Sequence, residues 1–342
     1  MLAAALTVTG IAAGTAFADE SAVAEFYSGK TVRFVVGTRV GSGGDTYARL
    51  IADHIGKHIP GNPNVIVENM PAAGGLVQAN WMYNQADRDG TVVGLTRESI
   101  PFEPILLGDA SKAEFKLDEL IWLSSPNMFP NVAISWHTSD VKTVGDLLEN
   151  ELIVGGIGQT GSTNDAYVLR NLLGFKYRVI NGYPGPSEID LAVENGELEG
   201  RATAGWTGLS TRHADWLRDG KINILYQTGA VKYPRIPDDV PSLMDFAKTD
   251  EQRAILELKY GSNAVGFPFF FPPEVPQERV DAVRKAFEAT YADPEFIKAA
   301  EAQHVDVFPV SHQEMEAVYK KAYESPQELR DKLAELSKPP AD

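Results

Sequence analysis

Val40-Gly41-Ser42-Gly43-Gly44-Asp45 separates a predicted strand from a predicted helix. The run at 31–36 is rich in β-branched residues, which indicates a buried strand. From 45 to 59, apolar residues recur at helical spacing. Glycines in such a turn let backbone N–H groups point inward, and the following helix adds the positive end of its dipole. The sequence therefore predicts an α/β unit with an anion cradle made of main chain.

The alternation of strands and helices continues along the chain. Strand-like runs are 31–36, 64–67, 91–95, 131–135, 152–157, 177–180, 222–227 and 265–271. Helical patterns are 45–59, 75–86, 162–173, 187–195, 209–218, 277–292, 294–303, 311–323 and 326–337. Such alternation predicts α/β architecture with mostly parallel sheets. Ser162-Thr163-Asn164-Asp165 is typical of a capping box, and Gly174 of the end of that helix.

Two apolar stretches punctuated by proline, 124–130 and 266–273, are predicted to cross between lobes. The expected first lobe is then 19–125 together with 265–342, and the second lobe is 126–264. This is the plan of a two-lobed clamshell that binds a ligand between its lobes and closes on it.

Composition and the first residues narrow the class of protein. A net charge of −16 argues against nucleic-acid binding, which needs a basic face. With no cysteine, the chain has no disulfide and no thiolate chemistry. Residues 2–17 are small and apolar, and Ala16-Phe17-Ala18 resembles a signal-peptidase site. We expect a signal peptide at 1–18, removed near Ala18, and a periplasmic location.

Several motifs occur in an order known from one family. In the first lobe these are FYSGKTVR at 26–33, VGSGGD at 40–45, ENMPAAGG at 68–75 and DGT at 89–91. They are similar to YPxKPVR, PGGxxD, ENRPGAGG and DGYT of the periplasmic receptors of tripartite tricarboxylate transporters, the Bug or TctC-like family. The second lobe agrees more loosely, through GSTND at 161–165 (with Asp165 where histidine is usual), GYPG at 182–185 and FPPEVP at 271–276 just after it.

The resemblance implies a type II (Venus-flytrap) periplasmic binding-protein fold with two crossover strands. It also implies a monomeric receptor, without a cofactor, that captures a small organic carboxylate (a di- or tricarboxylate or an aromatic one). Transport would be driven by protons or sodium, with the large and small membrane subunits of the transporter as partners. One alternative is a receptor that presents the carboxylate to a two-component sensor kinase. Another is a carboxylate-processing enzyme on the same fold.

In that family two first-lobe loops hold the ligand's carboxylate. Carried over, they are Gly41, Ser42, Gly43, Gly44 and Asp45, with Ala73, Gly74 and Gly75 opposite. We expect Asp45 to cap the helix and to orient water. Donors from the second lobe are expected at Gly161, Ser162, Thr163 and Asn164, with Tyr183 in the loop of a ligand-facing tyrosine. The structural alternative is tight turns and plain helix caps.

An arginine is the natural partner of a second carboxylate. Arg39, Arg97 and Arg201 are the candidates, with Arg39 preferred, and Trp206 follows the same predicted strand as Arg201. Catalytic motifs are absent from the sequence. His54 and His58 have metal-ligand spacing without the glutamate of HExxH, and GSGGD matches neither nucleotide-binding glycine motif. The sequence therefore favours a binding protein over an enzyme and predicts no metal.

Overall fold

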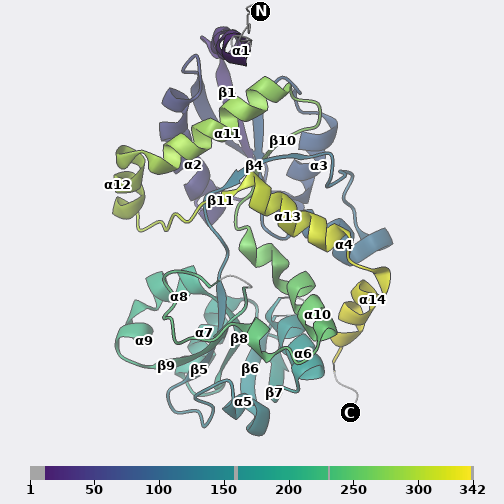
Figure 1. Cartoon of the computed structure of the whole chain (residues 1–342). Coiled ribbons are helices and arrows are strands. Elements are labelled where there is room, and N and C mark those ends of the chain that lie inside the picture. Colours follow the sequence, from purple (N-terminus) through teal and green to yellow (C-terminus); the bar gives the residue numbers. More distant parts are fainter. Residues whose placement is uncertain (1–11, 158–160, 230–231, 340–342) are drawn as a thin grey trace, which may run out of the picture. The chain divides into compact units, whose positions relative to one another are not determined.

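The computed structural model describes residues 12–157, 161–229 and 232–339 (Figure 1). They fall into two compact units. Unit 1 lies within Met1–Pro104, Asp109–Asn127 and Phe267–Ala317, and unit 2 lies within Ile105–Gly108, Met128–Gly266 and Val318–Asp342. Each unit carries its own sheet and its own core, so each is described separately.

Unit 1 is built, within the described residues, on a six-stranded sheet of order β11-β4-β10-β3-β1-β2. β1 (Thr31–Val36) pairs in parallel with β2 (Asn64–Asn69) and with β3 (Val92–Leu95). β10 (Phe269–Phe271) runs antiparallel between β3 and β4. The strands on the other side of β10 are β4 (Ile121–Ser125) and the short edge strand β11 (Val310–Ser311).

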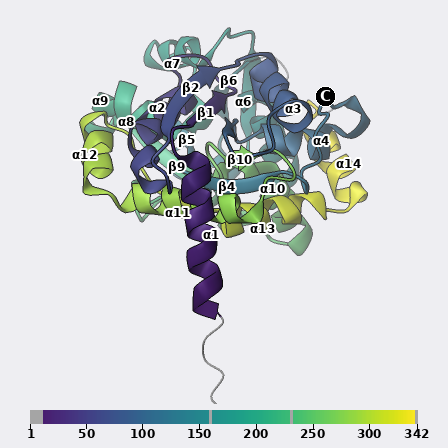
Figure 2. The same cartoon turned by 90° about the horizontal axis from the view of Figure 1, so that it is seen from above.

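Aromatic side chains pack a long helix of unit 1 against this sheet. Phe34 of β1 lies 5.2 Å from Phe269 of β10 and 6.3 Å from Phe287, measured between ring centroids, and all three are fully buried. Phe287 belongs to α11, the long helix that crosses the unit in Figure 1. Of α1, Val23 and Tyr27 are buried, while Figure 2 shows its beginning projecting beyond the rest of the unit. The helices with residues in unit 1 are α1 (Ala12–Tyr27), α2 (Gly43–Ile55), α3 (Leu76–Asn84), α4 (Glu103–Leu107), α11 (Gln277–Ala292), α12 (Pro294–Ala302) and α13 (His312–Tyr323).

Unit 2 carries a five-stranded sheet of order β7-β6-β8-β5-β9, again counted over the described residues. β6 (Leu152–Gly156) is parallel to β7 (Tyr177–Asn181) and to β8 (Gly200–Gly205). β5 (Asn131–Trp136) is antiparallel to β8 and to β9 (Ile222–Gln227). The helices that lie wholly within unit 2, among the described residues, are α5 (Asp146–Glu149), α6 (Ser162–Leu173), α7 (Pro186–Glu194), α8 (Trp206–Arg212), α9 (Ala214–Arg218), α10 (Asp250–Tyr260) and α14 (Gln327–Leu336).

The expectation of an α/β fold with two crossover strands is confirmed, but that of mostly parallel sheets is wrong. Both sheets are mixed, because β10 and β5 run against their neighbours. The helix expected at 209–218 is two helices, since His213 leaves the helical conformation at φ −121 and ψ 35. The chain from 318 onward belongs to unit 2 instead of the first lobe, because α14 packs on α6 and α10.

Candidate functional site

The two sheets share one topological feature, a reversal of strand order beside a central parallel strand. In unit 1 the chain passes from β1 through α2 to β2, and then through α3 to β3 on the other side of β1. In unit 2 it passes from β6 through α6 to β7, and then through α7 to β8. Open α/β sheets bind ligands at the carboxyl ends of strands where the order reverses. The ends of β1 and of β6 are therefore the candidate sites.

The loop after β1 forms a tight turn that delivers free amides to the start of α2. The Ser42 N–H donates to the Arg39 carbonyl at 3.1 Å, and Gly41 has φ +77, in the left-handed region that favours glycine. The amides of Gly43 and Gly44 open α2 and have no acceptor among the described residues. Backbone donors and the helix dipole thus point the same way, as an anion requires.

Asp45 does not cap α2, contrary to expectation. Ser42 is the N-cap, and its hydroxyl accepts from the Asp45 N–H at 3.5 Å. The Asp45 carboxylate accepts in return from the Gly41 N–H at 2.8 Å, from the Arg49 guanidinium at 3.0 Å and from Asn69 Nδ2 at 2.9 Å. Burial by itself would raise the pKa of Asp45, but these hydrogen bonds hold it below its ordinary value. The carboxylate is therefore ionised and serves to hold the loop in shape.

Asn69 is a residue of this site that the sequence analysis missed. It is the last residue of β2, and its side-chain amide also donates to the Thr38 carbonyl at 3.0 Å. The Asn69 oxygen also accepts from Arg49 of α2 at 3.0 Å, so this one side chain links the end of β2 to Thr38, Asp45 and Arg49. Its signal in the sequence is its place at the start of ENMPAAGG, directly after a predicted strand.

The second predicted loop, Ala73–Gly75, lies against the residue that follows β1, Gly37. Its residues have φ values of +47, +68 and +112. A Cβ at position 75 would lie 3.2 Å from the Gly37 carbonyl oxygen and 3.3 Å from Thr96 Oγ1. Close approach to β1 and β3 thus explains Gly75, whereas Gly74 has open space beside its Cα. Thr96 Oγ1 and Gln78 Oε1, both beside this contact, are buried and have no hydrogen-bond partner among the residues that the structure describes.

Of the three candidate arginines, two belong to unit 1. Arg39 is exposed and makes no ion pair within the described residues. The Arg97 guanidinium lies 3.5 Å from the carboxylate of its neighbour Glu98, which is itself buried. Arg39 is therefore the more available cation of the two.

Replacing Glu98 by glutamine is expected to stabilise the protein at high pH. Burial raises the pKa of Glu98 although the charge of Arg97 opposes the rise. A raised pKa in the folded state means that stability is greatest below the unfolded-state pKa and falls as pH rises through the folded-state pKa. The gain from Glu98→Gln, measured as the shift in urea midpoint, should be larger at pH 8 than at pH 4. An equal shift at both pH values would contradict this assignment.

The start of α6 differs from the predicted capping box. Gly161 is the N-cap, at φ +55, and no side chain caps the helix. Ser162 Oγ instead donates to the Gly155 carbonyl at 3.4 Å, and Thr163 Oγ1 donates to Asn181 Oδ1 at 3.0 Å. The predicted stop is confirmed, since Gly174 is the C-cap at φ +77. Asn164 is half-buried in the first turn.

A buried ion pair joins the first turn of α6 to α10. Asp165 Oδ1 lies 2.9 Å from Lys259 Nζ, and Thr203 of β8 donates to Asp165 Oδ2 at 2.6 Å. Lys259 comes from the last turn of α10, and its side chain keeps 18% of its surface exposed. The sequence analysis missed this lysine because α10 lies far along the chain from α6. It brings a cation to the carboxyl end of β8, next to the reversal point.

The remaining predicted residues of unit 2 are largely occupied in packing. Tyr183 is half-buried against the apolar cluster around Ile189. Trp206, the first residue of α8, is 5% exposed, and its backbone N–H donates to the Pro130 carbonyl. Arg201 is buried and donates from Nη1 to Asp190 at 2.6 Å, so it is not a free cation.

The residues suited to metal binding do not converge. His54 Nδ1 is paired with the Leu50 carbonyl of its own helix, and His58 Nε2 lies 3.1 Å from Asp293. No group of three metal-ligating side chains occurs within the part of the chain that the structure describes. No helix in that part has the length and apolar character needed to cross a bilayer.

Solved structures that superimpose on most of the chain identify its fold. A TctC solute-binding protein from Polaromonas superimposes with a TM-score of 0.70 at 18% identity, covering 90% of this chain and 99% of the other. The periplasmic binding protein BugD gives a TM-score of 0.58 at 18% identity, covering 91% and 98%. The chain has the fold of the TctC and Bug solute-binding proteins. The resemblance predicted from the motifs is therefore confirmed, together with the type II binding-protein fold.

Further relatives with the TctC/Bug fold carry ligands. MatC from Rhodopseudomonas palustris, with bound malate, gives a TM-score of 0.56 at 18% identity over 90% of this chain and 99% of that one. A second R. palustris protein, with adipate, gives 0.58 at 17% identity over 90% and 97%. In sequence, a UPF0065 protein from Cupriavidus necator is 27% identical over 296 residues, which is 84% of this chain and 82% of that protein. No protein-family model matches the chain.

Proposed function

We propose that this chain is a periplasmic solute-binding protein that captures a small organic carboxylate. The observation that carries the proposal is the pair of amides of Gly43 and Gly44 at the start of α2, in the loop that follows β1, which have no acceptor within the described part of the chain. A carboxylate accepts hydrogen bonds from such amides and is favoured by the positive end of the helix. The role is binding without chemistry on the ligand.

The surroundings of the two amides suit a carboxylate more than a bulkier anion. Asp45, whose charge would repel a ligand, is already bound by Arg49, Gly41 and Asn69 and turned into the loop. The exposed Arg39 adds a positive charge at the same turn. Net attraction therefore comes from dipoles and one flexible cation, which favours small anions with one or two carboxylates.

The ligand classes follow from the relatives. Proteins of this fold hold malate and adipate, which are both dicarboxylates. We extend that class to this chain, and with it export to the periplasm after removal of residues 1–18. The proposed partners are the large and small membrane subunits of a tripartite tricarboxylate-type transporter.

A thermal-shift screen of the purified chain tests this function. The panel pairs each acid with its neutral amide, for example adipate with adipamide and benzoate with benzamide. A ligand that binds only the folded state stabilises it by about 2.7 kcal/mol at a hundred times its Kd. We expect a rise of a few degrees in Tm with at least one acid and none with its amide. The absence of any acid-specific shift over a broad set of mono- and dicarboxylates would contradict the proposal.

A further inference from the structure

Unit 2 contains a pocket of about 260 Å³ that is lined by residues of unit 2 alone. Its lining residues come from β5 and the segment before it, from α7, from β8 and from α8 with the residue that follows it. Pockets for drug-sized ligands run from roughly 300 Å³ upward. This pocket therefore fits a smaller molecule.

Part of the pocket lining is a cluster of hydrogen-bonded charged and polar side chains. The Arg201 guanidinium donates from Nη1 to Asp190 Oδ1 at 2.6 Å, and His213 Nε2 lies 3.1 Å from Asp190 Oδ2. Arg201 and Asp190 are more than nine-tenths buried. The His213 ring stacks on Trp216, with 4.0 Å between centroids, which fixes the imidazole in place. Charged side chains are buried in proteins when an opposite charge compensates them, as Arg201 and Asp190 compensate each other here.

The cluster leaves donors unused. Arg201 Nε is buried without a partner, and within the described residues the only hydrogen bond from this guanidinium is the one to Asp190. Arg212, an exposed residue at the end of α8, also lines the pocket, and its guanidinium folds back over Gly208, so that a Cβ at 208 would lie 3.0 Å from Nη2. Arg212 has no acidic partner among the residues that the structure describes. With Asp190 neutralising Arg201, the charge of Arg212 is in excess.

The pocket also has apolar lining residues. They are Phe129, Pro130, Pro186 and Leu209. Pro186 is also the first residue of α7, whose positive end therefore borders the pocket. An apolar lining together with an excess cation matches a molecule with an apolar body and one negative group.

We propose that this pocket binds a small carboxylate with an apolar body, at a site of its own in unit 2. The carboxylate pairs with Arg212 and approaches the Arg201 guanidinium, while the body lies on Phe129 and Leu209. The site does not rest on the cradle of unit 1, so the two can be tested separately.

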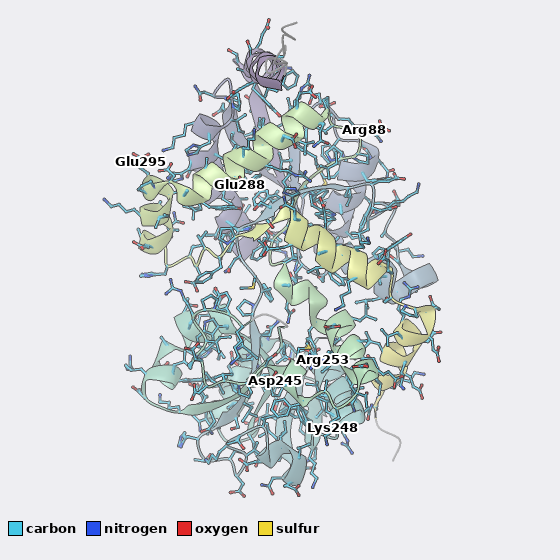
Figure 3. All side chains as sticks on the ribbon, in the orientation of Figure 1. Arg88, Asp245, Lys248, Arg253, Glu288 and Glu295 are labelled. Carbon is cyan, nitrogen blue, oxygen red and sulfur yellow. The ribbon has the colours of Figure 1, made fainter. Side chains whose placement is uncertain are left out.

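The experiment follows the His213 ring by long-range ¹H–¹⁵N correlation while benzoate is added to the full chain. His213→Gln identifies the signal among the six histidines. The titration is repeated with Gly43→Asp, which disables the cradle, and with benzamide as the neutral isostere. Arg212→Gln removes the excess charge. Arg253→Gln is the matched control, since this exposed arginine of α10 does not line the pocket (Figure 3).

We expect benzoate to shift the His213 signal saturably in both the wild type and Gly43→Asp, and benzamide to leave it unchanged. Arg212→Gln should weaken the apparent affinity at least tenfold and Arg253→Gln less than twofold, because Arg212 lines the pocket and Arg253 does not. A His213 signal that does not respond, or equal losses in the two arginine variants, would overturn the inference. Loss of the response in Gly43→Asp would also overturn it while supporting the cradle. In a third outcome, His213 responds to benzoate, but Gly43→Asp binds the acid found in the thermal-shift screen as tightly as the wild type does. That outcome would contradict the proposed function alone.

Discussion

Gly43→Asp is expected to reduce carboxylate affinity by roughly a hundredfold or more without unfolding the protein. Gly43 is the first residue of α2, where an acidic side chain favours the helix. The same carboxylate would stand about 5 Å from a bound anion, which costs about 3 kcal/mol at an effective dielectric constant of 20. A Cβ at this position lies 3.3 Å from the end of the Phe267 ring, so only a small adjustment is needed. Affinity is measured by isothermal titration calorimetry with an acid found in the screen.

Two control variants separate charge from bulk and from position. Gly43→Asn has the same size without the charge, and should lose much less affinity than Gly43→Asp. Gly145→Asp adds the same charge at the exposed N-cap of α5, where φ is −62 and the nearest atom to a Cβ is 3.5 Å away. It should bind as the wild type does. Equal affinity of Gly43→Asp and the wild type would remove the cradle from the site.

Asp45→Ala is expected to lower the free energy of unfolding by about 3 kcal/mol. The change leaves the Gly41 N–H without an acceptor, takes from the Asn69 amide one of its two acceptors and removes the charge partner of Arg49. Asp53→Ala, on the exposed face of the same helix, removes the same charge and should stay within about 0.5 kcal/mol of the wild type. Urea unfolding at pH 7 compares the two.

The effect of Asp45→Ala should also depend on pH. The folded-state pKa of Asp45 is lowered, so its contribution is present above the unfolded-state pKa and is lost as pH falls through the folded-state pKa. The difference between Asp45→Ala and the wild type should narrow in strongly acidic buffer. A difference that is constant with pH would mean that the side chain acts through packing and not through its charge.

Most helices and strands were predicted from strong local patterns in the sequence. The strands that were missed have weak patterns. β8 reads Gly-Arg-Ala-Thr-Ala-Gly, which has little β propensity. It is a strand because its small residues fit between two neighbours: a Cβ at Gly200 would lie 2.1 Å from the Ile134 carbonyl oxygen. Such tertiary constraints are not visible in a single sequence. α10 carried a usable signal that was overlooked, a threonine N-cap at Thr249 followed by acidic residues.

The same distinction between local signals and tertiary contacts applies to the residues of the candidate site. Backbone features that depend on neighbouring residues, such as the turn at Gly41, could be predicted. Ser42 and Asp45 even have capping-box spacing, which identifies the serine as the cap. Pairs from distant segments could not be predicted, as with Asp165 and Lys259 or Arg201 and Asp190. Arg201 was chosen for its charge, and only the structure shows that a buried aspartate already holds it.

The most direct test of the cradle is a backbone amide NMR titration of the ¹⁵N-labelled chain with a carboxylate that stabilises it. The amides of Gly43 and Gly44 have no acceptor among the described residues, so a carboxylate bound there must lengthen and polarise those two N–H bonds. The account predicts that both amide protons move downfield and saturate together with the calorimetric binding curve. Amides of Gly43 and Gly44 that stay in place at full occupancy would contradict it.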